Sequence, residues 1–350
     1  MHSSLKYGNR ENNINLLRFI AASMVIYYHM GILLGQPGIT VMGVSIGSIA
    51  VNIFFILSGY LIASSWTHST SFKSYFVRRA ARIFPALIVV VLVTTFVIGP
   101  LFTSLTLSDY FGSVGTWKYL SMIFLAPISN VLPGVFETLP YPSAVNGSLW
   151  TLRYEFLMYL LVPLLYFLFG KVGKNVRNPL LVAFVVFLIT GYCLISSGLL
   201  HVSEAVEKGF RLGAYFFIGS ALYEFGLIRF FDPQYSLLAL FLALIFTHES
   251  GSVCPLLMMV VTVVFTVGFS FAPQPKFARC FSKNDFSYGI YIWAFPIQQI
   301  LVQLGGGSSQ DSALLYSLVA FGITFVLAVG SWFLVEKPCM ALGKRLTKRF

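Results

Sequence analysis

The sequence predicts an all-α fold, a polytopic membrane bundle of about ten transmembrane helices with both termini cytoplasmic. Of its 350 residues, 57% are hydrophobic and only 10% are charged, too few polar groups for the surface of a soluble protein of this size. Apolar stretches long enough to cross a bilayer recur along almost the whole chain. The predicted spans are centred on residues 14–34, 45–66, 84–103, 147–169, 179–199, 210–228, 233–248, 255–272, 286–304 and 313–335.

The placement of basic residues supports this topology. If the N-terminus is cytoplasmic, most of the 23 lysines and arginines fall in cytoplasmic segments, and only Lys118 and Lys208 fall in segments on the opposite side. Arg18, Arg153 and Arg211 fall inside predicted helices or at their ends. The net charge of +11 therefore reflects membrane topology, and it gives no reason to expect nucleic-acid binding.

A single domain over residues 1–350 is the simplest organisation, because most loops are short and no internal repeat is visible. The exception is residues 104–146, predicted to be an extracytoplasmic loop rich in Gly, Pro, Ser and aromatic residues. Its stretch TWKYLSMIFLAPIS is short for a span, which favours an interfacial or re-entrant segment. Residues 336–350 form a basic cytoplasmic tail, expected to lie on anionic lipid.

Metal-binding and disulfide patterns are absent from the sequence. The cysteines have no paired spacing, and no H-E-x-x-H motif occurs. We therefore expect no metal site and no permanently bound cofactor. Glu224 and Glu336 lie near predicted cytoplasmic helix ends and are expected to pair with neighbouring basic residues.

The first span, LLRFIAASMVIYYHMG, contains Arg18 and His29. They are eleven residues apart, close to three helical turns, which places them on one face about 16 Å apart along the axis. An arginine within a span costs roughly 2.5 to 3.5 kcal/mol on insertion scales and usually faces the bundle interior. Arg18 could instead reach cytoplasmic headgroups. His29 could act as a general base or proton shuttle, or could form a helix-to-helix hydrogen bond.

Two further segments carry hydroxyl and basic side chains. In FFILSGYLI, Ser58 and Tyr60 flank Gly59, and tight helix packing there is at least as well supported as catalysis, because no G-x-S-x-G motif surrounds the serine. In VRRAARIFPAL, read as a basic loop before the third span, Arg79 and Arg82 are spaced to share a face. Guanidinium groups so placed suit phosphate esters.

The stretch NGSLWTLRYEFLMYL opens the fourth span from the outer side and contains Glu155 at a depth comparable to His29. Arg153 lies about 200° around the helix, so the two should not pair. A carboxylate within a span could orient an imidazole, or it could form a structural ion pair with Arg211 or another helix. Trp150 could anchor the interface or stack on a sugar ring.

Taken together, these segments resemble acyltransferase family 3, the integral membrane O-acyltransferases that modify bacterial surface glycans. The resemblance rests on Arg18 with ten residues before His29, and on the stretches FFILSGYLI, RRAARIFP, GSLWTLRYEF and SYGIYIWAFPIQQ, which follow in that order over nearly the whole chain. It implies that His29 is the catalytic histidine, that Arg18 is its partner, and that Arg79 and Arg82 help to hold acyl-CoA.

The expected function is therefore transfer of an acyl group, acetyl being common in the family, from cytoplasmic acyl-CoA to a hydroxyl of an extracytoplasmic or lipid-linked glycan. The expected location is the bacterial cytoplasmic (inner) membrane. Glu155 is a second catalytic candidate, and Ser58, Tyr60, Trp150 and Arg153 are candidates for the acceptor path or channel. The alternatives are a transporter or flippase with Arg18, His29 and Glu155 along a polar pathway, and a partner subunit without chemistry of its own.

Overall fold

A computed structural model describes residues 12–125, 130–170, 174–245, 254–282 and 284–347. In this part of the chain helices dominate, and the only paired strands are β1 (Thr40–Val41) and β2 (Val44–Ser45), an antiparallel hairpin with Thr40 opposite Ser45. The longer helices are α1 (Ile14–Leu33), α2 (Ile46–Thr67), α3 (Phe72–Val93), α7 (Trp150–Gly170), α8 (Lys174–Ser196), α9 (Glu204–Glu224), α10 (Gln234–Ile245), α11 (Pro255–Ser270), α12 (Ser287–Gly305), α13 (Ala313–Ser331) and α14 (Lys337–Thr347).

The predicted all-α class is confirmed. Every predicted span coincides with a helix or a helical run, and six runs among the described residues are long and apolar enough to cross a membrane. The other spans correspond to α9, which has charged residues in its first half, to α10 and α11, which have 12 and 16 residues, and to α12. A polytopic membrane bundle accounts for this set of helices.

The prediction of a basic loop before the third span is wrong. Helix α3 begins at Phe72, and Ser71 caps it by accepting a hydrogen bond from the backbone N–H of Ser74 at 3.1 Å. The stretch RRAARIFP therefore lies inside the helix. Hydropathy marks where a helix becomes apolar and not where it begins, so the charged first turns were read as loop. Helical spacing nevertheless places Arg79 and Arg82 one turn apart, as predicted.

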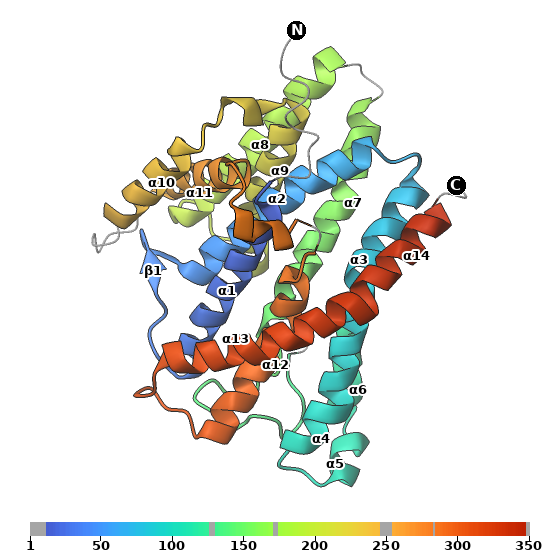
Figure 1. The fold of residues 1–350 in the computed structure, drawn as a ribbon, viewed down its shortest axis with the longest axis vertical. Coiled ribbons are helices and arrows are strands. Elements are labelled where there is room, and N and C mark those ends of the chain that lie inside the picture. The colour runs from blue at the N-terminus through green and yellow to red at the C-terminus, as the bar shows by residue number, and fades with distance from the viewer. Residues whose placement is uncertain (1–11, 126–129, 171–173, 246–253, 283, 348–350) are drawn as a thin grey trace. The chain divides into compact units, whose positions relative to one another are not determined.

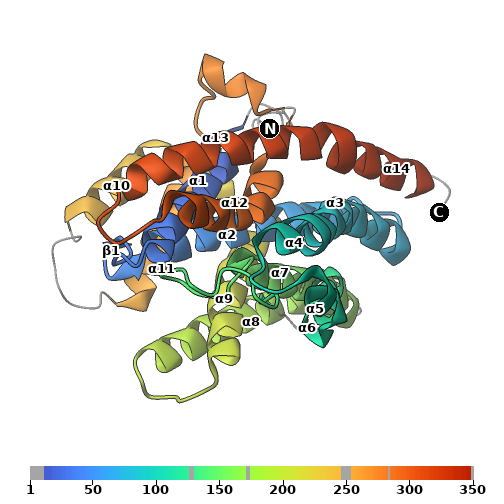
Figure 2. The same ribbon diagram turned by 90° about the horizontal axis from the view of Figure 1, so that it is seen from below.

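One compact unit comprises Met1–Ala21, Thr40–Ser69 and Tyr154–Asp285. Within it, α2 and α9 cross with their backbones in contact, and a Cβ on Gly59 would lie 1.8 Å from the Phe216 carbonyl oxygen. A Cβ on Gly219 would lie 2.0 Å from the Ile56 carbonyl oxygen, and the Ser220 hydroxyl donates to the Gly59 carbonyl at 3.1 Å. The packing interpretation of Gly59 is thus confirmed. Figure 2 shows α8 beside α9 in the same unit.

The second compact unit comprises Ala22–Ile39, Thr70–Arg153 and Phe286–Phe350. Helix α3 continues through a π-helical turn (Thr94–Ile98) into α4 (Gly99–Phe102), and the Tyr110 hydroxyl donates to the Thr95 carbonyl at 2.8 Å. A second π-helical turn (Trp332–Glu336) joins α13 to α14, which lies along α3 where Gly343 meets Ala81 (Figure 1). Such π-turns shift the helix register and commonly occur at functional sites.

The long loop of residues 104–146 contains only short helices in its described part. These are α5 (Leu107–Gly112), α6 (Val114–Tyr119) and a 3₁₀ helix (Leu120–Phe124) that ends at Leu125, where φ is +59°. This run is too short to span a membrane, in agreement with the sequence, although residues 126–129 lie outside the described residues. A 3₁₀ helix (Gly147–Leu149) then leads into α7. Two further 3₁₀ helices are Leu227–Phe230 and Lys276–Cys280.

Candidate active site

His29 lies in the last turns of α1 and packs against α12. Its ring meets the ring of Phe295 edge to face, with centroids 5.2 Å apart, and Phe295 also contacts Tyr141 at 6.5 Å. Gly147 covers Phe295 so closely that a Cβ there would lie 2.9 Å from the ring. Nδ1 of His29 is buried and has no hydrogen-bond partner among the described residues. The imidazole is therefore oriented by aromatic packing, and Nδ1 remains available to a bound ligand.

Gln298, which sequence reasoning missed, helps to fix this arrangement. Its Nε2 donates to the Ile26 carbonyl of α1 at 2.7 Å, one turn before His29, and the residue is fully buried. The next residue, Gln299, donates to the carbonyls of Tyr141 and Ala144 at 3.1 and 2.7 Å. Two adjacent glutamines within an apolar stretch are the sequence signal that could have identified them, since buried amides require partners.

Arg18, three turns earlier on α1, forms an ion pair. Its Nη1 lies 2.9 Å from Oδ2 of Asp285, and the two side chains are 16% and 12% exposed. The guanidinium carbon also lies 5.8 Å from the Phe54 ring centroid. Asp285 was missed, although it is an acidic residue between the basic segment around Arg279 and the SYGIYIWAFPIQQ stretch. The arginine is thus held by protein partners at a defined position.

Glu155 and Ser58 are brought together by the structure. The Ser58 hydroxyl of α2 donates to Oε1 of Glu155 at 2.9 Å, and the Tyr159 hydroxyl, one turn along α7, donates to the same oxygen at 2.5 Å. Among the described residues, the partners of the Glu155 carboxylate are the hydroxyl groups of Ser58 and Tyr159. The ion pair with Arg211 that was considered from the sequence is not formed in this part of the chain. Tyr60 packs edge to face with the rings of Tyr223 and Phe271. Both hydroxyl bonds end on one oxygen, so they fix the direction of the carboxylate.

Arg82 is held by the second π-helical turn. Its Nη1 lies 2.9 Å from Oε2 of Glu336, whose side chain is 1% exposed, and its guanidinium lies 5.5 and 5.6 Å from the ring centroids of Tyr288 and Trp332. Glu336 is paired with a basic residue, as expected, but the partner is Arg82 of α3 and not a residue near Glu336 in sequence. Arg79 lies one turn before Arg82 on the same helix and is partly buried.

Hydrogen bonds join the start of α7 and the residues before it to α12. The Asn146 side chain donates to the Ile292 carbonyl at 2.9 Å, and the hydroxyls of Thr151 and Tyr291 are 2.7 Å apart. These bonds set the orientation of the first turns of α7, where Trp150 and Arg153 lie partly buried.

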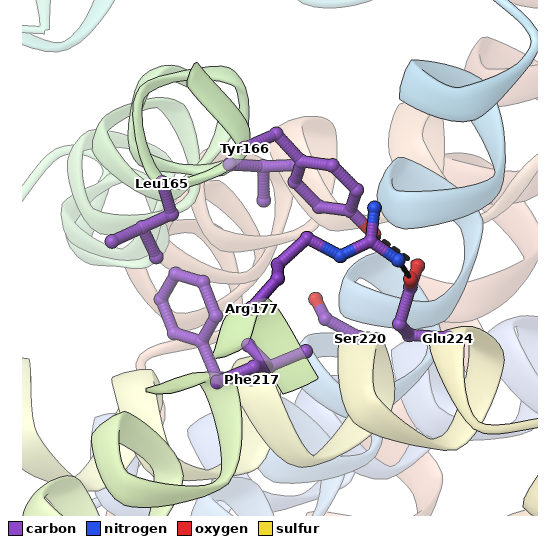
Figure 3. Close-up of a pocket in the computed structure, with 8 residues that line it drawn as sticks. Leu165, Tyr166, Arg177, Phe217, Ser220 and Glu224 are labelled. Carbon is purple, nitrogen blue, oxygen red and sulfur yellow. Dashed lines mark hydrogen bonds and ion pairs between the residues drawn. The ribbon is translucent and has the colours of Figure 1, made fainter. Parts of the chain in front are cut away.

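A third ion pair, also largely buried, belongs to the fold. Figure 3 shows Arg177 of α8 bonded to Glu224 of α9, and the Tyr166 hydroxyl donates to Oε2 of Glu224 at 2.6 Å. The expected structural pairing of Glu224 is thus confirmed. The pocket beside this group holds about 20 Å³ and has room for a single water molecule.

Comparison with known proteins identifies the class. A family model described as an acyltransferase domain, that of acyltransferase family 3, matches residues 11–335. An O-acetyl transferase of Shigella phage Sf6 is 31% identical over 346 residues, which cover 94% of this chain and 96% of that protein. Nodulation protein 10 of Rhizobium leguminosarum bv. viciae is 26% identical over 99% of this chain and 97% of its own length. Peptidoglycan O-acetyltransferase OatA of Listeria monocytogenes is 26% identical over 95% of this chain and 56% of its own length.

No solved structure matches the chain at a significant level. The long apolar helices indicate a membrane protein, and the family match makes it an acyltransferase. The chain belongs to acyltransferase family 3, and the resemblance drawn from its sequence is confirmed. Membership of a family of enzymes decides against the transporter and partner-subunit alternatives.

Proposed function

We propose that this enzyme transfers an acetyl group from acetyl-CoA, on the cytoplasmic side of a bacterial inner membrane, to a hydroxyl of an extracytoplasmic or lipid-linked glycan. Relatives named as an O-acetyl transferase and a peptidoglycan O-acetyltransferase support the acetyl group and the glycan acceptor. The distribution of basic residues supports about ten spans with both termini cytoplasmic, the loop of residues 104–146 outside and the tail of residues 336–350 inside. Short loops and the lack of a visible internal repeat in the sequence support a single domain.

The observation that carries the proposal is the availability of Nδ1 in a histidine whose ring is already oriented by Phe295. In the proposed reaction, His29 takes the proton of the acceptor hydroxyl as its oxygen attacks the thioester carbonyl carbon. The carbon–sulfur bond then breaks, and the CoA thiolate leaves and receives that proton. An acyl-histidine intermediate is the alternative sequence of steps, and labelled protein formed from acetyl-CoA without acceptor would reveal it.

The donor site in this proposal uses the arginines of α3. Arg79 and Arg82 contact the phosphates of CoA, and Glu336 holds Arg82 in place. The pantetheine arm then extends beside α1, from Arg18 toward His29, over the roughly 16 Å that eleven helical residues span. Asp285 keeps Arg18 directed at this path.

Glu155 is proposed to assist the reaction through its second carboxylate oxygen, since Ser58 and Tyr159 both donate to Oε1. Trp150 and Arg153, in the first turn of α7, remain our candidates for contacting the acceptor. Ser58 and Tyr60 are proposed to line the path near Glu155, with Tyr60 held among aromatic rings.

The test uses sealed membrane vesicles and acetyl-CoA labelled in the acetyl group. Inside-out vesicles expose the cytoplasmic face, and we expect label from external acetyl-CoA to reach polysaccharide inside them. Right-side-out vesicles should give no transfer until they are made permeable. Equal transfer in both orientations before permeabilisation would contradict the proposed direction. An Arg79→Ala variant should need more acetyl-CoA for half-maximal rate, with an unchanged requirement for polysaccharide.

A further inference from the structure

A polar pocket of about 530 Å³ lies in the second unit, between the end of α4, the loop after Pro133 and the last turn of α12. We call it the outer polar pocket, because these segments are extracytoplasmic in the proposed topology. Its polar walls are supplied by Thr103, Ser104, Glu137, Thr138 and Gln303. Cavities of this volume are typical of sites for small ligands or for one part of a larger ligand.

The walls of the pocket are fixed by hydrogen bonds. The Thr103 hydroxyl donates to the Pro133 carbonyl at 2.8 Å, and the Ser104 backbone N–H donates to the Gly134 carbonyl at 2.9 Å. Oε1 of Glu137 accepts the Gly134 N–H at 3.0 Å. Gly134 has φ of +72°, and a Cβ there would lie 2.5 Å from the Thr103 hydroxyl oxygen, so the turn is closely fitted. A preformed site loses little entropy when it binds a ligand.

The chemistry of the walls suits a neutral ligand rich in hydroxyl groups. Carboxylate, amide and hydroxyl side chains supply both acceptors and donors, which a polyhydroxyl ligand needs. Glu137, Thr138 and Gln303 are exposed and can be reached from solvent. No lysine or arginine lines the pocket in the described part of the chain, which disfavours phosphate or an anionic headgroup.

The pocket is linked to His29 in two ways. The loop that forms one wall continues to Tyr141, which contacts Phe295, and Phe295 contacts the His29 ring. Along α12, Gln303 follows Phe295 by eight residues, about 12 Å of helix. A ligand seated in the pocket must therefore extend beyond it to bring a hydroxyl near His29.

We propose that the outer polar pocket binds one sugar unit of the glycan acceptor, next to the unit that is acetylated. This inference rests on the proposed function and names the part of the chain that selects the acceptor. It predicts that oligosaccharides or polysaccharides are acceptors and that free monosaccharides are poor ones, because a single sugar cannot occupy the pocket and reach His29 together.

The test measures binding separately from transfer. Fluorescently labelled surface polysaccharide, extracted from cells that carry this protein, is titrated against proteoliposomes containing wild type, Glu137→Gln or Gln303→Leu. Glutamine at position 137 can still accept the Gly134 N–H, so the loop is retained. We expect each variant to bind about tenfold more weakly, also in a His29→Ala background. Glu207→Gln, which removes an exposed charge on α9, should bind like wild type.

Unchanged binding by both pocket variants, or no binding by wild type, would overturn the proposal. Equal weakening by Glu207→Gln would also overturn it, since the effect would then be one of overall charge. Wild-type binding that the pocket variants weaken, without any acetyl transfer, would support the pocket and reject the proposed function.

Discussion

Removal of the Glu336 carboxylate should destabilise the second unit strongly. Its side chain is 1% exposed and its partner Arg82 is 14% exposed, so Glu336→Ala leaves a largely buried guanidinium without its carboxylate. Breaking a buried ion pair in this way costs about 3–5 kcal/mol. The rings of Tyr288 and Trp332 still contact the cation and offset part of the loss. We therefore expect the low end of that range, about 3 kcal/mol, or roughly 100-fold in the unfolding equilibrium.

The assay is reversible unfolding in mixed micelles, with increasing dodecyl sulfate and circular dichroism as the signal. The double variant Arg82→Met with Glu336→Leu removes both charges and should recover most of the lost stability, because an apolar pair of similar volume is often neutral or stabilising. An unfolding curve for Glu336→Ala that matches wild type would show that the ion pair does not stabilise the second unit, and a double variant no more stable than the single one would show that the unpaired charge is not the cause of the loss. The recovered double variant should still bind acetyl-CoA more weakly, which separates the ligand role of Arg82 from its structural role.

Two further variants test the packing and the charge partners. Gly59→Ala should lower the free energy of unfolding by about 1–3 kcal/mol, because its Cβ would meet the Phe216 carbonyl. The control is Gly322→Ala, where nothing lies within 4 Å of the new Cβ, and it should leave the free energy of unfolding unchanged in the same titration. Equal effects of the two alanines would contradict the close α2 and α9 crossing. Asp285→Asn should lower the free energy of unfolding by about 1–3 kcal/mol and raise the acetyl-CoA concentration needed for half-maximal rate, because Arg18 loses its ion pair. A half-maximal acetyl-CoA concentration identical to that of wild type would exclude Asp285 as the residue that directs Arg18.

The helices were predictable because each carries a local signal. Apolar length located the helices, since hydropathy is read within a short window. The start of α3 was missed because Lys73, Arg78 and Arg79 lower the hydropathy of its first turns. Ser71 at the N-cap was the signal that could have located it.

The partners of the site residues were less predictable, because they depend on contacts distant in sequence. Arg82 and Glu336 are 254 residues apart, and nothing local to either residue indicates the other. Glu155 was recognised as an isolated carboxylate, but its bond to Ser58, 97 residues away in sequence, required the crossing of α2 and α7. Buried polar groups can be recognised from sequence, whereas the groups that satisfy them are set by the tertiary fold.

The most direct test of His29 as the catalytic residue is acetyl transfer by His29→Ala, with His29→Gln as the variant closer in size. Both are reconstituted in permeabilised vesicles with labelled acetyl-CoA and the extracted polysaccharide, after circular dichroism and micelle unfolding show that the fold is retained. We expect loss of transfer by at least about 100-fold, in line with removal of a general base, while acetyl-CoA and polysaccharide still bind. Transfer at the wild-type rate by either folded variant would contradict the assignment of His29 as the catalytic residue.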